Sequence, residues 1–347
     1  MRLAVIGATG VVGGTILRVL DERSIAIDEL LAYASRERPE GLSFRGKTVP
    51  VAAATRERLL ADRPDVAFFA SSDDASAELA ESLVEAGIVV IDNTSTFRLA
   101  PHVPLVIPEV NPHAIGADDR LFPVANCTAI VLTVALAPLD RAVGLRSVRV
   151  ATYQAVSGAG RAGLDALAAE EGGAEPGTTF AAAIHRNVVP QVGSYDGDGD
   201  TGEEQKVVAE TRKMLNRPDL RIAATTVRVP VMRAHSEAVF FRTERATDVR
   251  ELAEALRNAP GVVFHERGIV TPRDVEDTDL VHVARLRPEP DDPTDTRFQM
   301  WVVGDQLRKG AATNGVQILE LLISQGRFGP VLRQAQDDTV VARMTQA

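Results

Sequence analysis

Short apolar runs alternate with amphipathic stretches over residues 2–93. Four of these runs have the length and composition of buried strands: residues 2–6, 29–35, 65–71 and 88–93. Apolar side chains recur at helical spacing over residues 15–23 and 75–87. Because strands that alternate with helices form open, doubly wound parallel sheets, we expect an N-terminal Rossmann-like α/β domain.

The pattern changes after residue 127. Residues 128–139 predict a helix that ends at Pro138, because proline interrupts the helical hydrogen bonds. Residues 147–158 predict a strand that runs into a glycine turn. Further strands are predicted at residues 221–232, 237–244 and 298–306. The first two of these further strands are expected to be antiparallel neighbours. Helices are predicted at residues 251–259 and 311–325. The second part of the chain therefore predicts an α+β domain with a mixed or antiparallel sheet.

Composition narrows the class of protein. The net charge of −10 and the pI of about 5.2 give no reason to expect a nucleic-acid or anionic-membrane partner. A single cysteine cannot form an internal disulfide, which fits a reducing cytoplasm. No apolar run is long enough to span a membrane. Acidic stretches at residues 196–204 and 289–296 predict exposed loops, and residues 328–347 predict a tail.

A glycine-rich turn, GATGVVG at residues 7–13, follows the first predicted strand and opens the first helix. Gly7 permits a tight turn, and Gly10 lets the backbone approach a pyrophosphate at the helix N-terminus. A tight turn without a ligand is the alternative interpretation. The position between a strand and a helix at the start of a parallel sheet favours a dinucleotide site.

The end of the second strand indicates which dinucleotide. Enzymes that use NAD often carry an acidic residue there, about 20 residues after the turn, for the ribose 2′-hydroxyl. Here the strand ends with Ser35 and Arg36, a hydroxyl and a guanidinium that suit a 2′-phosphate. NADP is therefore the predicted cofactor, although Glu37 argues in the other direction.

Cys127 directly precedes the helix predicted at 128–139. A helix N-terminus or a nearby histidine lowers a thiol pKa, as a nucleophilic cysteine requires. A lone cysteine is, however, more often a small buried apolar residue. Of six histidines, His235 follows one predicted strand and precedes another, so it is the candidate partner, with a purely structural histidine as the alternative.

Several ordered motifs carry a resemblance to a known family. The segments PVANCTAIVL, TYQAVSGAGRAG, RVPVMRAHSEAV and LRKGAATNGVQILELL follow GATGVVG in that order. Together they resemble the aspartate-β-semialdehyde dehydrogenase family from Met1 to about Gln325. The resemblance implies reduction of L-aspartyl-4-phosphate to aspartate semialdehyde with NADPH and release of phosphate. This reaction lies on the biosynthetic route to lysine, methionine, threonine and diaminopimelate.

The resemblance also implies roles for individual residues. Cys127 would be the nucleophile that forms a thioacyl intermediate, Gln154 would orient the acyl group, and His235 would be the acid/base. Arg228 would bind the substrate α-carboxylate and Glu203 its amino group. The substrate phosphate would be bound by Arg98, Asn126 and Lys206. The cofactor would be bound by Gly7, Thr9, Gly10, Val11, Val12, Ser35, Arg36, Ser71, Ser157, Gly158 and Asn314. No metal-ligand spacing is present.

The family's organisation implies two domains. Residues 1–126 and 311–347 would form the NADP-binding Rossmann domain, and residues 127–310 would form the catalytic and dimerisation domain of a homodimer or homotetramer. Three alternatives stay open. One is a paralogue that reduces another acyl phosphate, similar to N-acetylglutamyl-phosphate reductase. The others are a nucleotide-binding paralogue without catalysis and a cysteine hydrolase.

The sequence departs from the family pattern at three places. One is the loop before Glu203, where DGDGDTG is more acidic than is usual in the family. Thr128 and Ala129 follow Cys127 where the family often has serine and threonine. Asp73 and Asp74 lie near the expected path of the cofactor or phosphate, where small residues are usual. No proposed catalytic group is lost, but the substrate could be a related β-acyl phosphate.

Overall fold

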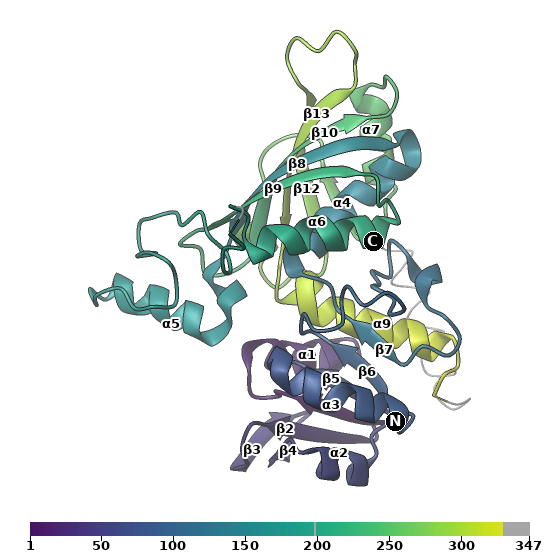
Figure 1. The fold of residues 1–347 in the computed structure, drawn as a ribbon, viewed down its shortest axis with the longest axis vertical. Helices are drawn as coiled ribbons and strands as arrows, with labels where there is room; N and C mark the ends of the chain where they lie inside the picture. Colours follow the sequence, from purple (N-terminus) through teal and green to yellow (C-terminus); the bar gives the residue numbers. More distant parts are fainter. Residues whose placement is uncertain (198, 329–347) are drawn as a thin grey trace. The chain divides into compact units, whose positions relative to one another are not determined.

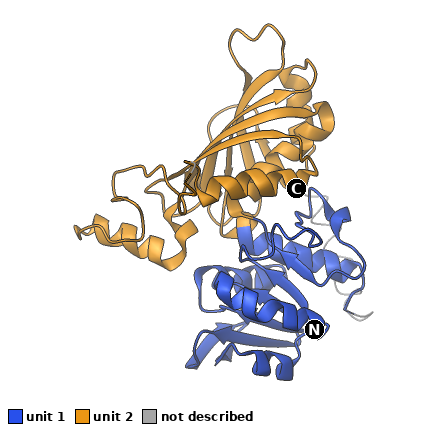
Figure 2. Ribbon diagram, viewed as in Figure 1, with its two compact units in different colours: residues 1–125, 311–347 blue, residues 126–310 orange. Residues whose placement is uncertain are grey.

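The computed structural model describes residues 1–197 and 199–328, and it divides into two compact units (Figure 2). Unit 1 comprises Met1–Ala125 and the chain from Ala311 onward. Unit 2 comprises Asn126–Gly310. None of the helices in the described part of the chain is both long and apolar enough to span a membrane.

Unit 1 is built on a sheet with the strand order β3-β4-β2-β1-β5-β6-β7 among its described residues (Figure 1). Its strands are β1 (Arg2–Ile6), β2 (Glu29–Ala34), β3 (Arg38–Phe44), β4 (Lys47–Ala53), β5 (Val66–Phe69), β6 (Val89–Asp92) and β7 (Leu121–Pro123). All neighbouring strands are parallel except β3 and β4. The predicted doubly wound sheet is therefore confirmed.

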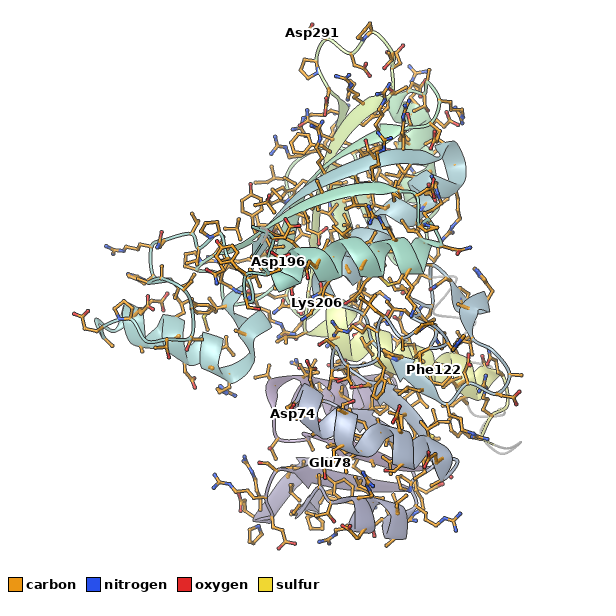
Figure 3. All side chains as sticks on the ribbon, in the orientation of Figure 1. Asp74, Glu78, Phe122, Asp196, Lys206 and Asp291 are labelled. Carbon is orange, nitrogen blue, oxygen red and sulfur yellow. The ribbon has the colours of Figure 1, made fainter. Side chains whose placement is uncertain are left out.

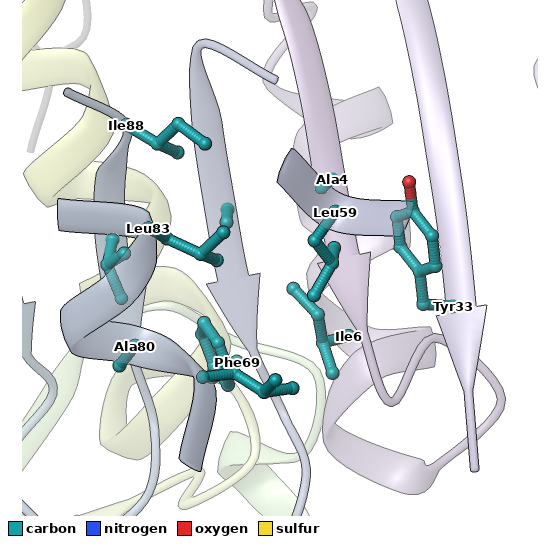
Figure 4. Packing of buried hydrophobic residues seen from close by; sticks show 11 residues of the cluster. Ala4, Ile6, Tyr33, Leu59, Phe69, Ala80, Leu83 and Ile88 are labelled. Atoms are coloured by element: carbon teal, nitrogen blue, oxygen red, sulfur yellow. The ribbon is translucent and has the colours of Figure 1, made fainter. Parts of the chain in front are cut away.

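Helices cover the sheet of unit 1. They are α1 (Val11–Glu22), α2 (Arg56–Asp62), α3 (Asp73–Glu85), α9 (Thr313–Ser324) and the short 3-10 helix η1 (Pro112–Ala114). Apolar residues from β1, β2, β5 and β6 meet Leu59 of α2 and Leu83 of α3 in one buried cluster (Figure 4). Burial of such side chains contributes roughly 1.5–3 kcal/mol each and fixes the turns at the strand ends.

Four strands and two helices of unit 1 lie where the apolar runs predict them, and α9 lies within the predicted helix 311–325. The sequence interpretation missed β3, β4, α2 and β7. The edge strand β3, with the sequence RPEGLSF, contains no fully buried side chain, so it has no apolar run to detect. Helix α2 and strand β7 are too short to establish a period.

Unit 2 contains a mixed sheet with the strand order β11-β12-β13-β10-β8-β9 among the residues described. Its strands are β8 (Leu145–Gln154), β9 (Arg221–Arg228), β10 (His235–Thr243), β11 (Val262–His265), β12 (Val281–Pro288) and β13 (Arg297–Gly304). Its helices are α4 (Cys127–Val143), α5 (Gly160–Glu171), α6 (Gly202–Leu215), α7 (Val249–Arg257) and α8 (Pro272–Val275). A 3-10 turn, η2 (Val156–Ala159), follows β8, and a π-helical turn, η3 (Arg308–Ala312), precedes α9.

Two predictions for unit 2 are wrong. Helix α4 continues through Pro138 to Val143, because every side chain from Thr128 to Leu139 is buried and packing outweighs one lost hydrogen bond. The strands predicted at 221–232 and 237–244 are not neighbours. Strand β8 lies between β9 and β10, parallel to β9 and antiparallel to β10. Alternating side chains identify a strand but not its partner.

The predicted loops need smaller corrections. The loop predicted at 196–204 ends at Thr201, whose hydroxyl caps α6 and forms a capping box with Glu204. Residue 198 of this loop and residues 329–347 of the predicted tail lie outside the described residues. The loop predicted at 289–296 connects β12 and β13, with Asp291 at its tip (Figure 3).

Side chains near the end of β8 alternate between the buried face and the partly exposed face of the sheet. Thr152 and Gln154 are buried, whereas Tyr153 between them is 39% exposed and contacts the Trp301 ring, with centroids 5.5 Å apart. Strand β10 is antiparallel to β8, so its first residue, His235, lies close to the end of β8. The ends of these two strands therefore bring Gln154 and His235 together.

Gly13 and Gly14 allow a stability test of the turn in unit 1. A Cβ atom on Gly13 would lie 2.1 Å from the Gly7 carbonyl oxygen, whereas one on Gly14 would meet no atom within 4 Å. We expect Gly13→Ala to destabilise the protein by about 1–3 kcal/mol through overpacking. Gly14→Ala should stabilise it by about 0.5–1 kcal/mol through helix propensity. Thermal unfolding followed by circular dichroism checks both values, and equal Tm values for the two variants would contradict the proposed contact.

Candidate active site

Cys127 is the first residue of α4, and Asn126 is its N-cap. The Asn126 side-chain oxygen accepts hydrogen bonds from the backbone N–H groups of Thr128 and Ala129, at 3.0 and 3.1 Å. An asparagine at this position satisfies the exposed N–H groups of the first turn and so determines where the helix begins. The cap places the Cys127 thiol at the positive end of the helix dipole.

His235 lies beside the thiol. Its Nε2 is 3.4 Å from Cys127 Sγ, and its Nδ1 accepts a hydrogen bond from the Ala155 backbone N–H at 3.0 Å. The ring is fully buried. Because Nδ1 is an acceptor, we assign the proton of the neutral ring to Nε2, which faces the sulfur. Burial, and then the positive charge of Arg228, hold the pKa of His235 well below its usual value.

Glu203, in the first turn of α6, accepts hydrogen bonds from two amide side chains. Its Oε1 accepts hydrogen bonds from Asn126 Nδ2 at 2.9 Å and from Gln154 Nε2 at 3.0 Å. The Gln154 carbonyl oxygen accepts a bond from the Thr152 hydroxyl at 3.1 Å. One carboxylate oxygen therefore organises two predicted site residues, and the other oxygen of Glu203 faces no hydrogen-bond donor among the described residues.

Arg228, the last residue of β9, is the buried cation of the cluster. Its Nη1 donates to the Ala155 carbonyl oxygen at 2.7 Å. Burial lowers the pKa of Arg228, while the charges of Glu203 and Cys127 act in the opposite direction. The backbone of Ala155 therefore holds His235 through its N–H and Arg228 through its carbonyl group.

Two glycines leave room around these side chains. A Cβ atom on Gly158 would lie 2.7 Å from Arg228 Nη1 and 3.2 Å from His235 Cε1. A Cβ atom on Gly310 would lie 2.9 Å from the Cys127 Cβ. Any side chain at either position would displace the reactive groups.

Two further predicted residues belong to unit 2, the buried Ser157 and the partly buried Lys206. The Ser157 hydroxyl donates to the Met232 carbonyl oxygen and accepts from Gln306 Nε2, so it is engaged within the unit. Lys206 lies one helical turn after Glu203 on α6 and is partly buried (Figure 3). Its ammonium group makes no hydrogen bond or ion pair with any described residue.

The predicted cofactor residues of unit 1 gather at the carboxyl ends of β1, β2 and β5. Gly7 has φ +88°, and a Cβ atom there would lie 2.2 Å from the Ala70 carbonyl oxygen and 3.2 Å from the Ser71 nitrogen. The N–H groups of Gly7 and Ala8 donate to Tyr33 at the end of β2. The exposed Ser35 and Arg36 follow this strand.

The N-terminus of α1 suits an anion. Gly10 is its N-cap, so no side chain caps the helix, and its first turn holds no acidic residue. Thr9 and Gly10 are exposed, and Val11 and Val12 are partly buried. Free N–H groups at such a helix end bind phosphates. The observed turn therefore fits the pyrophosphate of a dinucleotide.

Arg98 and Asn314 are held elsewhere in unit 1. Arg98 is buried and donates from Nη2 to the Asn93 carbonyl oxygen at 2.9 Å. Asn314, on α9, is fully buried and donates from Nδ2 to the Val106 carbonyl oxygen at 3.0 Å. Asp73, which departs from the family pattern, accepts from the N–H and hydroxyl of Ser95. This acid therefore joins the start of α3 to the loop after β6.

Sequence reasoning missed several contacts of the site. The backbone of Ala155 gives no side-chain signal at all. Gly310 lies in the quoted motif LRKGAATNGVQILELL, so its glycine was available as a clue to close packing. Glu210, a buried acid in a helix, accepts from the Asn126 N–H at 2.5 Å. Within residues 1–197 and 199–328, no group of three or more His, Cys, Asp or Glu could hold a metal ion.

Comparisons with known proteins find relatives over nearly the whole chain. Residues 2–117 match the family described as semialdehyde dehydrogenase, NAD binding domain, and residues 136–309 match semialdehyde dehydrogenase, dimerisation domain. An aspartate-semialdehyde dehydrogenase of Aquifex aeolicus is 41% identical over 339 residues, covering 94% of this chain and 98% of the relative. Aspartate-semialdehyde dehydrogenase 2 of Vibrio cholerae is 42% identical over 334 residues, covering 93% and 97%.

A solved structure shows the same fold. The crystal structure of aspartate semialdehyde dehydrogenase II from Vibrio cholerae complexed with ASA gives a TM-score of 0.87 at 41% identity. The match covers 93% of this chain and 98% of that chain. Identity of this level over nearly the full length of both proteins confirms the resemblance inferred from the ordered motifs: the chain belongs to the aspartate-semialdehyde dehydrogenase family.

Proposed function

We propose that this protein reduces L-aspartyl-4-phosphate to L-aspartate-4-semialdehyde with NADPH, through a thioacyl intermediate on Cys127. The observation that carries the proposal is the 3.4 Å approach of Cys127 Sγ to His235 Nε2, next to the acidic Glu203 and the buried Arg228. A nucleophile, a hydrogen-bond donor and two groups of opposite charge are the parts that this substrate requires.

Charge complementarity supports the substrate assignment. Aspartyl phosphate carries a carboxylate, an ammonium group and a phosphate. Arg228 would pair with the carboxylate, because a guanidinium binds it in forked geometry. Glu203 would accept the ammonium group on its remaining oxygen. Lys206, Arg98 and Asn126 would bind the phosphate. An N-acetylated substrate has no ammonium group for Glu203, which argues against the N-acetylglutamyl-phosphate reductase alternative.

Acyl transfer would be the first chemical step. The Cys127 thiolate attacks the acyl carbon, the C–S bond forms, the C–O bond to phosphate breaks and phosphate leaves. The His235 Nε2–H is directed at the sulfur and would hydrogen-bond the oxygen that becomes negative on the attacked carbon. Gln154 would orient the acyl group with its second amide hydrogen, because one is already donated to Glu203.

Reduction would complete the cycle. When bound, NADPH supplies a hydride to the acyl carbon. Collapse of the resulting oxyanion breaks the C–S bond, restores the Cys127 thiolate and releases the aldehyde, with His235 as the acid/base that holds the proton near this oxygen. Gly158 would leave space for the reacting groups, since no side chain fits there.

Unit 1 is proposed to bind NADP. The turn at Gly7–Gly13 and the uncapped N-terminus of α1 fit a pyrophosphate, and Ser35 and Arg36 would bind the ribose 2′-phosphate. Glu37, which opposed this assignment, lies 3.1 Å from Arg58, which offsets its charge. We propose Ser71, Ser157 and Asn314 as further cofactor contacts. Unit 2 would form the homodimer or homotetramer, in keeping with its match to a dimerisation domain.

The first prediction concerns the nucleophile. The reverse reaction, phosphate-dependent reduction of NADP with aspartate semialdehyde, uses a stable substrate and is followed by absorbance. Wild type should be active only with phosphate, and Cys127→Ser should lose activity by at least about 1,000-fold, because a neutral hydroxyl replaces a thiolate. Retained NADP binding by Cys127→Ser serves as the folding control. Activity without phosphate would indicate a different reaction, and no activity in folded wild type would move the search to other acyl phosphates.

The second prediction concerns cofactor choice. Arg36→Ala should raise KM for NADP roughly tenfold, the equivalent of about 1.4 kcal/mol, and leave KM for NAD unchanged, because only NADP carries the 2′-phosphate. Arg146→Ala removes an exposed arginine from unit 2 and is the matched control. If Arg36→Ala changed both KM values equally, Arg36 would not read the 2′-phosphate.

The third prediction concerns the protonation of His235. The unfolded chain binds a proton at this residue below about pH 6.5, whereas the folded protein, with its lowered pKa, does not. The free energy of unfolding should therefore fall as pH decreases below 6.5, by up to about 1.4 kcal/mol per pH unit. His235→Gln should show a shallower dependence between pH 7.5 and 5.5 in urea titrations. The exposed variant His113→Gln should follow wild type. Equal slopes for all three proteins would show that His235 takes up a proton as readily in the folded protein as in the unfolded chain.

A further inference from the structure

Helix α6 carries three carboxylates, Glu203, Glu204 and Glu210, and the proposed reaction does not use Glu210. It lies seven residues, or about two helical turns, after Glu203 and therefore on the same face of the helix. Its side chain is inside unit 2, with the residue only 1% exposed. A buried acid is unfavourable unless it is hydrogen-bonded, so its contacts indicate what it does.

One contact of Glu210 is with the residue before the nucleophile, and its charge also acts on Lys213 on the same helix. Its Oε2 accepts the backbone N–H of Asn126 at 2.5 Å, from a different helix and 84 positions away in the sequence. A hydrogen bond to a charged acceptor is short and roughly twice as strong as a neutral one. The Asn126 N–H lies just outside α4, so the helix itself provides no partner for it.

Asn126 is thus held from three directions. Its N–H donates to Glu210, its Nδ2 donates to Glu203, and its Oδ1 accepts from the first turn of α4. Its backbone adopts φ −53° and ψ 136°, which turns the chain from an extended approach into the helix. Cys127 follows directly, so the orientation of this one residue sets the direction of the thiol.

We infer that Glu210 is a positioning residue, which fixes Asn126 so that the sulfur of Cys127 faces His235. The inference deepens the proposed function and rests on Cys127 as its nucleophile. Glu210 would act by fixing the position of Asn126 through its hydrogen bond. Its negative charge would not help, because a nearby negative charge disfavours a thiolate. A neutral side chain that still accepts the Asn126 N–H should therefore suffice, whereas one that cannot reach it should fail.

Alkylation of Cys127 by iodoacetamide tests this inference without any substrate. The chain holds a single cysteine, so incorporation localised to the Cys127 peptide by mass spectrometry reports on this sulfur. The rate is measured from pH 5 to 10 in full-length wild type, Glu210→Gln, Glu210→Asp and Glu210→Leu. Gln keeps a hydrogen-bond acceptor but loses the charge. Asp keeps the charge but is one methylene too short to accept the Asn126 N–H. Leu has neither an acceptor nor a charge.

Glu204→Leu is the matched control. Glu204 is a buried carboxylate on the same helix that accepts backbone N–H groups of Thr201 and Thr226, and it contacts none of the site residues. Its replacement removes two buried hydrogen bonds from backbone N–H groups, of the kind that Glu210 makes with Asn126. A purely structural effect of losing a carboxylate from α6 would therefore appear in this variant too, as a lowered Tm.

The expected result separates the effect of the hydrogen bond to Asn126 from the effect of the negative charge. Glu210→Leu and Glu210→Asp should alkylate about tenfold more slowly at pH 7, the scale of a lost helix-cap interaction, with the midpoint of the pH profile moved upward. Glu210→Gln should remain within about twofold of wild type, and Glu204→Leu should match the wild-type profile. In turnover, kcat should fall in the Leu and Asp variants while KM for NADP stays unchanged.

Other outcomes overturn the inference. A Glu210→Asp profile that superimposes on wild type would exclude the positioning role, even if Glu210→Leu failed to fold. Equal slowing in Glu204→Leu would show a general effect of the helix. Failure of the proposed function is recognised separately, as an active Cys127→Ser variant or the absence of turnover, because the alkylation rates require neither substrate nor cofactor.

Discussion

The hydrogen bond from the Ala155 amide to His235 Nδ1 determines what the imidazole can do. With Nδ1 occupied as an acceptor, the proton of the neutral ring lies on Nε2, 3.4 Å from the sulfur. Burial and Arg228 both oppose a second proton. The ring is therefore a directed donor in the resting protein, and the same peptide segment holds Arg228 through its carbonyl group. The strand end after β8 thus fixes a donor and a cation at once.

The N-terminus of α4 is the second fixed point. Asn126 closes the helix with its own side chain and is held by two carboxylates of α6. Helix and sheet together place one sulfur, one imidazole and one guanidinium, and the imidazole and the guanidinium are held by backbone groups of Ala155. Such support limits the reorganisation that the reacting groups must undergo, which is where catalytic sites gain much of their effect.

Sequence patterns predicted what depends on apolar periodicity or on ordered motifs. The parallel sheet of unit 1 follows from four apolar runs, and the family follows from motifs around Cys127 and His235. The polar edge strand β3 has no such pattern. The predicted end of α4 was wrong, because burial of the helix outweighs the tendency of Pro138 to end it. The Ala155 and Glu210 contacts join a backbone group to a distant residue, and no side-chain pattern encodes a pairing of that kind. The roles of the individual site residues stay predictions.

Strand β8 carries a constraint on how the protein can change over evolutionary time. Thr152 and Gln154 are buried beside Glu203, while Tyr153 packs against Trp301 on the opposite side of the strand. Inserting or deleting a single residue reverses which side chains face each way. The start of β8 already holds one extra residue, Arg146, opposite the register shift between Arg242 and Thr243. Descendants of this sequence can therefore change the length of β8 at that end, whereas residues 152–154 should vary by substitution only.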